Sequence, residues 1–186
     1  MILEELKKKL KSEKGNVFDI IIYGSLMKGK TKPNDIDVIV VFNSGTLKER
    51  LGELQSIKSR IRDISSIKID AKQILLKDLF APEFMARTGI MLEGYSVFRE
   101  KGFSETLGFK AFSIFCYSIS EMSHSQKVKF NYILAGRGDE GLIKILDGER
   151  MASGAIKIPI RNSIEFEEFL KKNNVKFSKK NVLEEI

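Results

Sequence analysis

The chain has 186 residues, of which 42% are hydrophobic, so it can bury one core or two small ones. Its single cysteine, Cys116, and single histidine, His124, exclude a disulfide framework and a Cys/His zinc site within one chain. The charged N-terminus lacks the apolar segment of a secretory signal and no apolar run is long enough to span a membrane, so we expect a cytoplasmic protein without a membrane partner. The net charge of +7 favours an anionic partner.

In the first half, apolar residues alternate between the spacing of helices and that of buried strands. A helix is predicted over the first dozen residues and ends near Gly15. Strands are predicted at 17–23, 35–42 and 67–76, with a short edge strand at 95–98. Helices are predicted at 46–59 and at 79–92, the second stopped by Gly94. Residues 1–102 therefore read as an α/β (α+β) domain.

Residues 103–186 differ from the first half in their pattern of apolar and aromatic residues, and we expect them to form a second, smaller α+β region. An aromatic-rich segment at 110–119 is strand or helix. A helix at 126–135 stops at Gly136, and a loop follows over 136–141. Residues 155–160 read as a strand, and Ser163 is expected to cap a helix that runs to residue 172.

Two carboxylates stand at the start of the predicted strand 35–42. Side chains alternate along a strand, so Asp35 and Asp37 share one face while Ile36 and Val38 take the other. Like charges in one small space cost stability unless a cation lies between them. Oxygen-only ligands select a hard ion, and Mg²⁺, or Mn²⁺ in its place, is the cofactor predicted here.

A phosphate-binding segment precedes this pair. Gly24 allows close backbone approach, and Ser25 adds a hydroxyl at what would be a helix N-terminus, where free N–H groups favour phosphate. Lys28, Lys30 and Lys32 add positive charge. Gly24, Ser25, Lys28 and Lys30 are therefore the candidate nucleotide-binding residues.

These residues resemble the motif of the nucleotidyltransferase superfamily that includes DNA polymerase beta. The motif is Gly-Ser, a spacer, then Asp-x-Asp between hydrophobic flanks. Here it is Gly24-Ser25, nine residues, and Asp35-Ile36-Asp37, with "IIY" before it and "VIVVF" after it. The resemblance implies a mixed sheet flanked by helices, a nucleoside triphosphate such as ATP as substrate, and two-metal nucleotidyl transfer onto an acceptor hydroxyl.

The resemblance also implies a third carboxylate, on a later strand, that activates the acceptor hydroxyl. Asp70 fits best because it lies within the alternating strand "SIKIDAKQI", where it shares a face with Lys68 and Lys72. Asp63 and Asp78 are the alternatives. Asp35, Asp37 and Asp70 are thus the expected catalytic and metal-binding residues.

The second region offers candidate acceptor contacts in Lys127, Lys129 and Arg137. Phe130 and Tyr132 are core residues in the simpler interpretation and base-stacking residues in the alternative. Cys116 is expected to be buried packing, and His124 to lie at a helix entry or on the surface.

The acceptor stays open between nucleic acid, protein and small molecule. One alternative is a nucleic-acid-binding module, for RNA or DNA, on a nucleotidyltransferase scaffold that has lost turnover. Another is antitoxin-like transfer of AMP to a partner protein, which small members of the superfamily that resemble the first half carry out.

Overall fold

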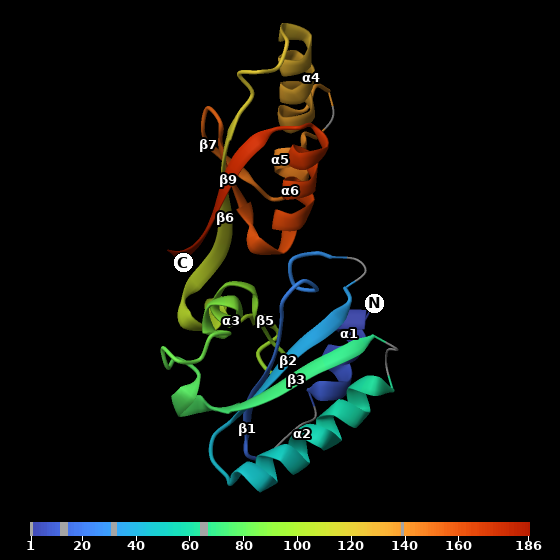
Figure 1. Cartoon of the computed structure of the whole chain (residues 1–186), viewed down its shortest axis with the longest axis vertical. Helices are drawn as coiled ribbons and strands as arrows, with labels where there is room; N and C mark the ends of the chain where they lie inside the picture. Colours follow the sequence, from blue (N-terminus) through green and yellow to red (C-terminus); the bar gives the residue numbers. More distant parts are fainter. Residues whose placement is uncertain (1, 12–14, 31–32, 64–66, 139) are drawn as a thin grey trace. The chain divides into compact units, whose positions relative to one another are not determined.

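The computed structural model describes residues 2–11, 15–30, 33–63, 67–138 and 140–186. It divides into two compact units, Met1–Gly108 and Phe109–Ile186 (Figure 1). The sequence places this boundary near residue 102. In the structure β5 (Lys101–Gly102) pairs with β4 (Tyr95–Ser96), and the 3-10 helix η2 (Ser104–Leu107) follows, so the first unit continues to Gly108.

The first unit is built on a mixed sheet with the strand order β3-β2-β1-β4-β5. Strands β1 (Val17–Tyr23) and β2 (Asp35–Phe42) are antiparallel, and β2 runs parallel to β3 (Lys68–Leu75). The predicted strands and the mixed α+β class, with a sheet flanked by helices, are confirmed.

Helices pack on both faces of this sheet. Leu6 and Leu10 of α1 (Ile2–Leu10), with Ile57 and Ile61 of α2 (Leu47–Arg62), are buried against one face, which also carries Ile36, Val38 and Val40 of β2. The opposite face carries Ile39 and Val41, which pack with Leu79 and with Ile90 of α3 (Arg87–Glu93). Alternation along β2 therefore places Asp35 and Asp37 on the α3 face.

The helix predicted at 79–92 is wrong over its first half. The 3-10 helix η1 (Leu76–Asp78) and a series of turns come first, and α3 begins only at Arg87. Pro82 explains the difference, because proline cannot donate a backbone hydrogen bond and disfavours helical geometry at Ala81. The predicted stop at Gly94 is correct.

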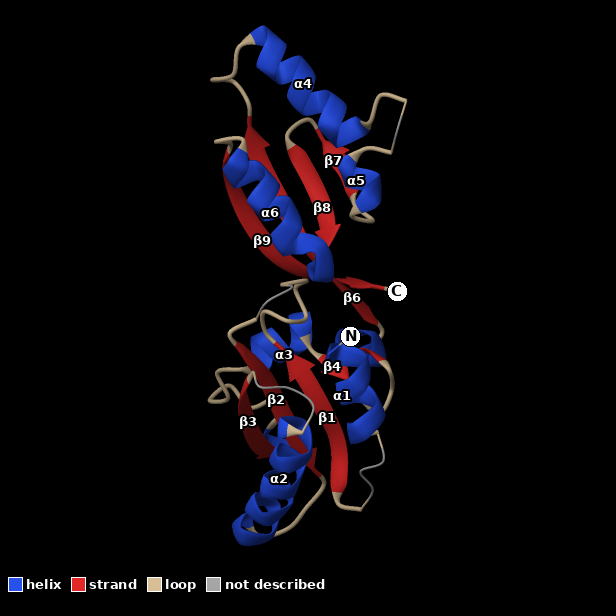
Figure 2. Ribbon diagram, turned by 90° about the vertical axis from the view of Figure 1, so that its right-hand side faces the viewer, coloured by secondary structure: helices blue, strands red, loops and turns tan. Residues whose placement is uncertain are grey.

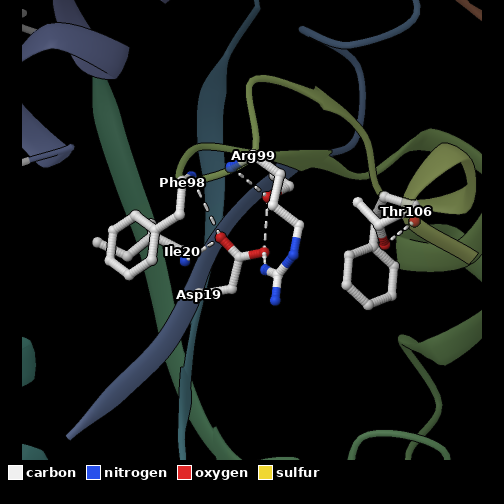
Figure 3. A network of polar contacts seen from close by, with 7 residues as sticks. Asp19, Ile20, Phe98, Arg99 and Thr106 are labelled. Carbon is white, nitrogen blue, oxygen red and sulfur yellow. Dashed lines mark hydrogen bonds and ion pairs between the residues drawn. The ribbon is translucent and has the colours of Figure 1, made fainter.

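A buried polar network ties the β4–β5 hairpin to β1 (Figure 3). Asp19 of β1 is fully buried. Its carboxylate accepts hydrogen bonds from the Ser96 hydroxyl at 2.7 Å, from the Arg99 guanidinium at 2.7 Å and from the Ile20 amide at 2.9 Å. Removing one partner from such a buried pair typically costs about 3–5 kcal/mol. The interruption that Asp19 makes in the apolar run of β1 is thus structural.

The second unit has the strand order β7-β8-β6-β9, with every neighbouring pair antiparallel. Along the chain, β6 (Phe109–Ser118) and α4 (His124–Ala135) come first. A short helix α5 (Leu142–Ile145), β7 (Glu149–Ala152), β8 (Ala155–Pro159), a 3-10 turn η3 (Ile160–Asn162), α6 (Ser163–Lys172) and β9 (Lys176–Glu185) follow. This β-α-β-β-α-β order is the ferredoxin-like arrangement.

The helices of the second unit cover one face of its sheet (Figure 2). Phe115 of β6, Phe130 of α4 and Phe166 of α6 form the centre of that core. Because Phe115 faces the helices, the adjacent Cys116 faces away and is exposed, which corrects its expected burial. Ser163 is the first residue of α6 and makes no capping bond, so the predicted cap is also wrong.

Residues 110–119, undecided from the sequence, form the strand β6, and the predicted helix 126–135 begins at His124, where Ser123 and Gln126 make a capping box. His124 is exposed at the helix entry, as expected. No helix in the described part of the chain is long and apolar enough to cross a membrane.

Candidate active site on strands β2 and β3

Asp37 lies at the centre of a row of polar residues across the sheet. Its register partner in β1 is Tyr23 and its register partner in β3 is Asp70. Register partners on neighbouring strands project from the same face, so Tyr23, Asp37 and Asp70 share the α3 face with Asp35. Strand pairing thus places the three carboxylates predicted from the sequence on one face of the sheet, with Asp70 beside Asp37.

The Asp70 carboxylate is paired with the Lys72 ammonium, Oδ2 to Nζ 3.2 Å, and both side chains are about half exposed. The alternatives for the third carboxylate lie elsewhere. Asp63 is the C-cap of α2, and Asp78 lies in η1. Only Asp70 stands on the strand next to Asp35 and Asp37.

Gly24 lies directly against the Asp37 carboxylate. Its φ is +80°, and a Cβ built at this position would stand 2.2 Å from Asp37 Oδ2. Glycine is therefore required here both for the backbone conformation and for the close approach. The glycine of the Gly-Ser element therefore leaves the space that the Asp37 carboxylate occupies.

The segment after Gly24 is a series of turns, so the helix expected at Ser25 is absent. The Met27 amide donates to the Gly24 carbonyl at 3.1 Å, and the Lys30 amide donates to the Ser25 carbonyl at 3.2 Å. A helix N-terminus therefore does not supply phosphate-binding N–H groups. The groups available are the Ser25 hydroxyl and the lysine side chains; Lys32 lies outside the described residues.

Lys28 makes a contact that the sequence did not predict. Its Nζ lies 2.9 Å from Glu93 Oε1, and the Glu93 side chain is only 10% exposed. Glu93 is the last residue of α3, so this ion pair fastens the turn after Gly24 to the helix on the same face as Asp37. Lys30, in contrast, is exposed.

The carboxylates affect one another electrostatically. Burial, and next the negative charges of Asp35 and Asp70, raise the pKa of Asp37 above its ordinary value. Burial likewise raises the pKa of Tyr23. The hydrogen bond to Asp70 raises the pKa of Lys72 and keeps this ammonium charged. Ionisation of Asp37 is therefore disfavoured by its burial and by the two carboxylates beside it.

We expect Asp37→Asn to raise the melting temperature of the metal-free protein by a few degrees at neutral pH. The folded-state pKa of Asp37 lies above its unfolded value of about 3.9. At acid pH below that value Asp37 is protonated in both states, and ionisation costs stability as the pH rises through the folded pKa. The gain should thus disappear on acidification, measured by thermal melts in EDTA. Asp78→Asn is the control, and a gain that grew towards acid pH would contradict this account.

The residues of this face fit a hard divalent ion. The possible metal ligands of the row are oxygen atoms, and burial, together with the negative charges of Asp35 and Asp70, disfavours the ionised form of Asp37. Within the described ranges no three carboxylate, thiol or imidazole groups already converge on one point. Mg²⁺ needs only one or two protein carboxylates, because waters and substrate phosphates complete its shell. Asp35 and Asp37 are the residues that would hold it.

The candidate acceptor residues lie on and after α4. Lys127 and Lys129 are two positions apart on the helix, so they point in different directions, and Lys129 is the more exposed. The guanidinium of Arg137 lies 4.8 Å from the ring centre of Tyr132, whose side chain is exposed. Phe130 is 2% exposed and belongs to the core, so the base-stacking alternative is wrong for this residue, whereas Tyr132 is 44% exposed and its expected place in the core is wrong.

The second unit also contains a cavity of about 240 Å³, far in the chain from the carboxylates. Lys157 lines it, and its ammonium already bridges Glu149 at 3.0 Å and Glu184 at 2.8 Å. The cavity's central cation is therefore neutralised in place, and the polar row of β1, β2 and β3 is the better candidate for chemistry.

Residues 3–85 match the family model described as "Nucleotidyltransferase domain". The matched region contains Gly24, Ser25, Asp35, Asp37 and Asp70, and it supports a general nucleotidyl transfer activity. No curated protein matches the chain. The resemblance carried by the Gly-Ser and Asp-x-Asp motif is confirmed over this part of the chain, which matches the nucleotidyltransferase domain model.

Proposed function

We propose that the protein is a metal-dependent enzyme that transfers a nucleoside monophosphate from a nucleoside triphosphate to an acceptor hydroxyl. The observation that carries the proposal is the register of β2 and β3, which sets Asp70 opposite Asp37 on the face that also holds Asp35. The match of residues 3–85 to the family model supports nucleotidyl transfer in general, and the metal dependence and the roles below are proposed from the geometry.

Asp35 and Asp37 would hold the divalent ions, and Gly24 leaves room for the Asp37 carboxylate. Bound there, the ions would neutralise charge on the triphosphate and lower the pKa of the attacking hydroxyl. Asp70 accepts the proton of that hydroxyl. The oxygen of the acceptor hydroxyl then attacks the α-phosphorus. The bond between the α-phosphorus and the oxygen that bridges it to the β-phosphate breaks, which releases pyrophosphate.

The turn after Gly24 receives the triphosphate. Ser25 offers a hydroxyl and Lys30 an exposed ammonium. Lys28 is held by Glu93 at 2.9 Å, so its main contribution is to position the turn, and its charge reaches the phosphates from that fixed place. The acceptor is proposed to contact the second unit through Lys127, Lys129 and Arg137.

The test is an assay of the full chain with Mg²⁺ or Mn²⁺ and each α-labelled nucleoside triphosphate in turn. RNA, DNA ends and cellular protein are offered as separate acceptors. We expect label on one acceptor class, equimolar pyrophosphate, and loss of both in EDTA.

A wild-type protein that labels none of these acceptors but binds RNA or DNA would instead support the nucleic-acid-binding alternative. Label on protein alone would support AMP transfer to a partner protein. Transfer that continues in EDTA would contradict the metal dependence.

A further inference from the structure

Strand β9 forms one edge of the ferredoxin-like sheet over its whole length (Figure 2). Every residue of β9, from Lys176 to Glu185, is paired with β6 on one side. On its other side, β9 pairs with no strand of the described residues. A long edge strand presents backbone N–H and C=O groups to any strand that fits beside it.

The charges along β9 are divided between its two halves. Lysines occupy the first half, at 176, 179 and 180, and glutamates occupy the second half, at 184 and 185. Lysines on an edge strand commonly prevent further pairing, because they repel a second strand. Here the strand carries glutamates as well as lysines. When two copies of β9 lie antiparallel, the lysines of one copy can therefore stand opposite the glutamates of the other.

Two identical strands that pair antiparallel are related by a twofold axis perpendicular to the sheet. That axis keeps each side chain on its own face, so residues opposite each other must be an even number of positions apart. The axis therefore passes through one residue of β9, which lies opposite itself in the second copy. Only a few registers remain.

The charges distinguish between these registers. An axis at Lys180 pairs Lys176 with Glu184 but places the Lys180 ammonium opposite its own copy at the centre of the contact. An axis at Asn181 places Lys179 opposite Leu183 and Lys180 opposite Val182. An axis at Val182 places Lys180 opposite Glu184 and Lys179 opposite Glu185, while Val182 meets itself. By symmetry each of these ion pairs occurs twice.

We propose that β9 is a self-association strand, which pairs antiparallel with β9 of a second copy about Val182 and joins two four-stranded sheets into one. Two of these side chains already have partners within the unit. Glu184 lies 2.8 Å from Lys157 and keeps 51% of its side chain exposed, and Lys179 lies 3.1 Å from Glu167. Lys180 and Glu185 are exposed. Pairing of one strand buries little area, so the dimer forms reversibly.

The test is sedimentation equilibrium of the full chain over a range of concentrations. We expect a monomer–dimer equilibrium for the wild type. Lys180→Glu places two glutamates opposite each other, and Glu184→Lys places two lysines opposite each other. Each single variant should weaken dimerisation by roughly tenfold or more, since two symmetry-related pairs change from attraction to repulsion.

The double variant Lys180→Glu, Glu184→Lys recreates the pair with its charges exchanged and should recover dimerisation relative to both single variants. Lys176→Glu is the matched control: it makes the same charge change on the same face of β9 but outside the paired stretch, and should leave the equilibrium unchanged. A wild type that stays monomeric, a double variant no better than the singles, or a control as harmful as Lys180→Glu would each overturn the proposal.

Discussion

Gly24→Ala is expected to lower the rate of nucleotidyl transfer by about 10²-fold or more, while the protein stays folded. The added methyl group would stand 2.2 Å from Asp37 Oδ2, so either the turn or the Asp37 carboxylate must move. A displacement of about 1 Å in a catalytic group can cost roughly 10²-fold. The backbone adds strain of about 1–2 kcal/mol, because alanine disfavours a φ of +80°. Turnover and Mn²⁺ affinity would both be measured.

Gly108→Ala separates the two causes. Gly108 has a φ of +84°, nearly that of Gly24, but a Cβ built there meets nothing within 4 Å. This variant should therefore lose a similar amount of thermal stability and keep full turnover and metal affinity. If both variants lost activity equally, strain alone would explain the result and the contact between Gly24 and Asp37 would have no special role.

The core of the candidate site was predictable from the sequence because each part of its signal is local. The apolar runs of β1 and β2 fix two strands, alternation sets Asp35 and Asp37 on one face, and the glycine marks the turn between them. The family resemblance implies a third carboxylate on a later strand, and alternation in that strand favours Asp70 over Asp63 and Asp78. The place of Asp70 opposite Asp37 depends on the parallel register of β2 and β3, which no local pattern encodes.

The features that the sequence did not predict arise from pairing between distant segments. Glu93 reads as an ordinary surface charge near a helix end, and only the fold brings it to Lys28. Residues 176–185 are mostly polar, so they show no strand signal until β6 pairs with all of them. In β6, the buried Ser113 and Phe115 alternate with more exposed neighbours. Only this pattern of burial distinguishes a strand from the helix that the sequence also allowed.

Asp70→Asn is expected to reduce turnover by roughly 10²- to 10⁴-fold, the usual cost of losing a general base, and to leave nucleotide binding nearly unchanged. The amide cannot take the proton of the acceptor hydroxyl, but Asp35 and Asp37 still hold the ions and the triphosphate. The variant also releases Lys72, which is now paired with Asp70 at 3.2 Å. Single-turnover kinetics and equilibrium binding of a non-hydrolysable triphosphate would separate the two effects.

Asp78→Asn is the matched control for this substitution, because Asp78 is an exposed carboxylate in η1, just after β3. It should keep wild-type turnover.

Lys72→Met tests whether the lysine itself matters. If Lys72 only neutralises Asp70 until the ions bind, its loss should leave the maximal rate intact. Full turnover in Asp70→Asn together with a loss in Asp78→Asn would move the general base from β3 to η1. A loss of nucleotide binding equal to the loss of turnover would instead make Asp70 part of the triphosphate and metal site, because a residue that acts only on the attacking hydroxyl affects the rate and not the binding.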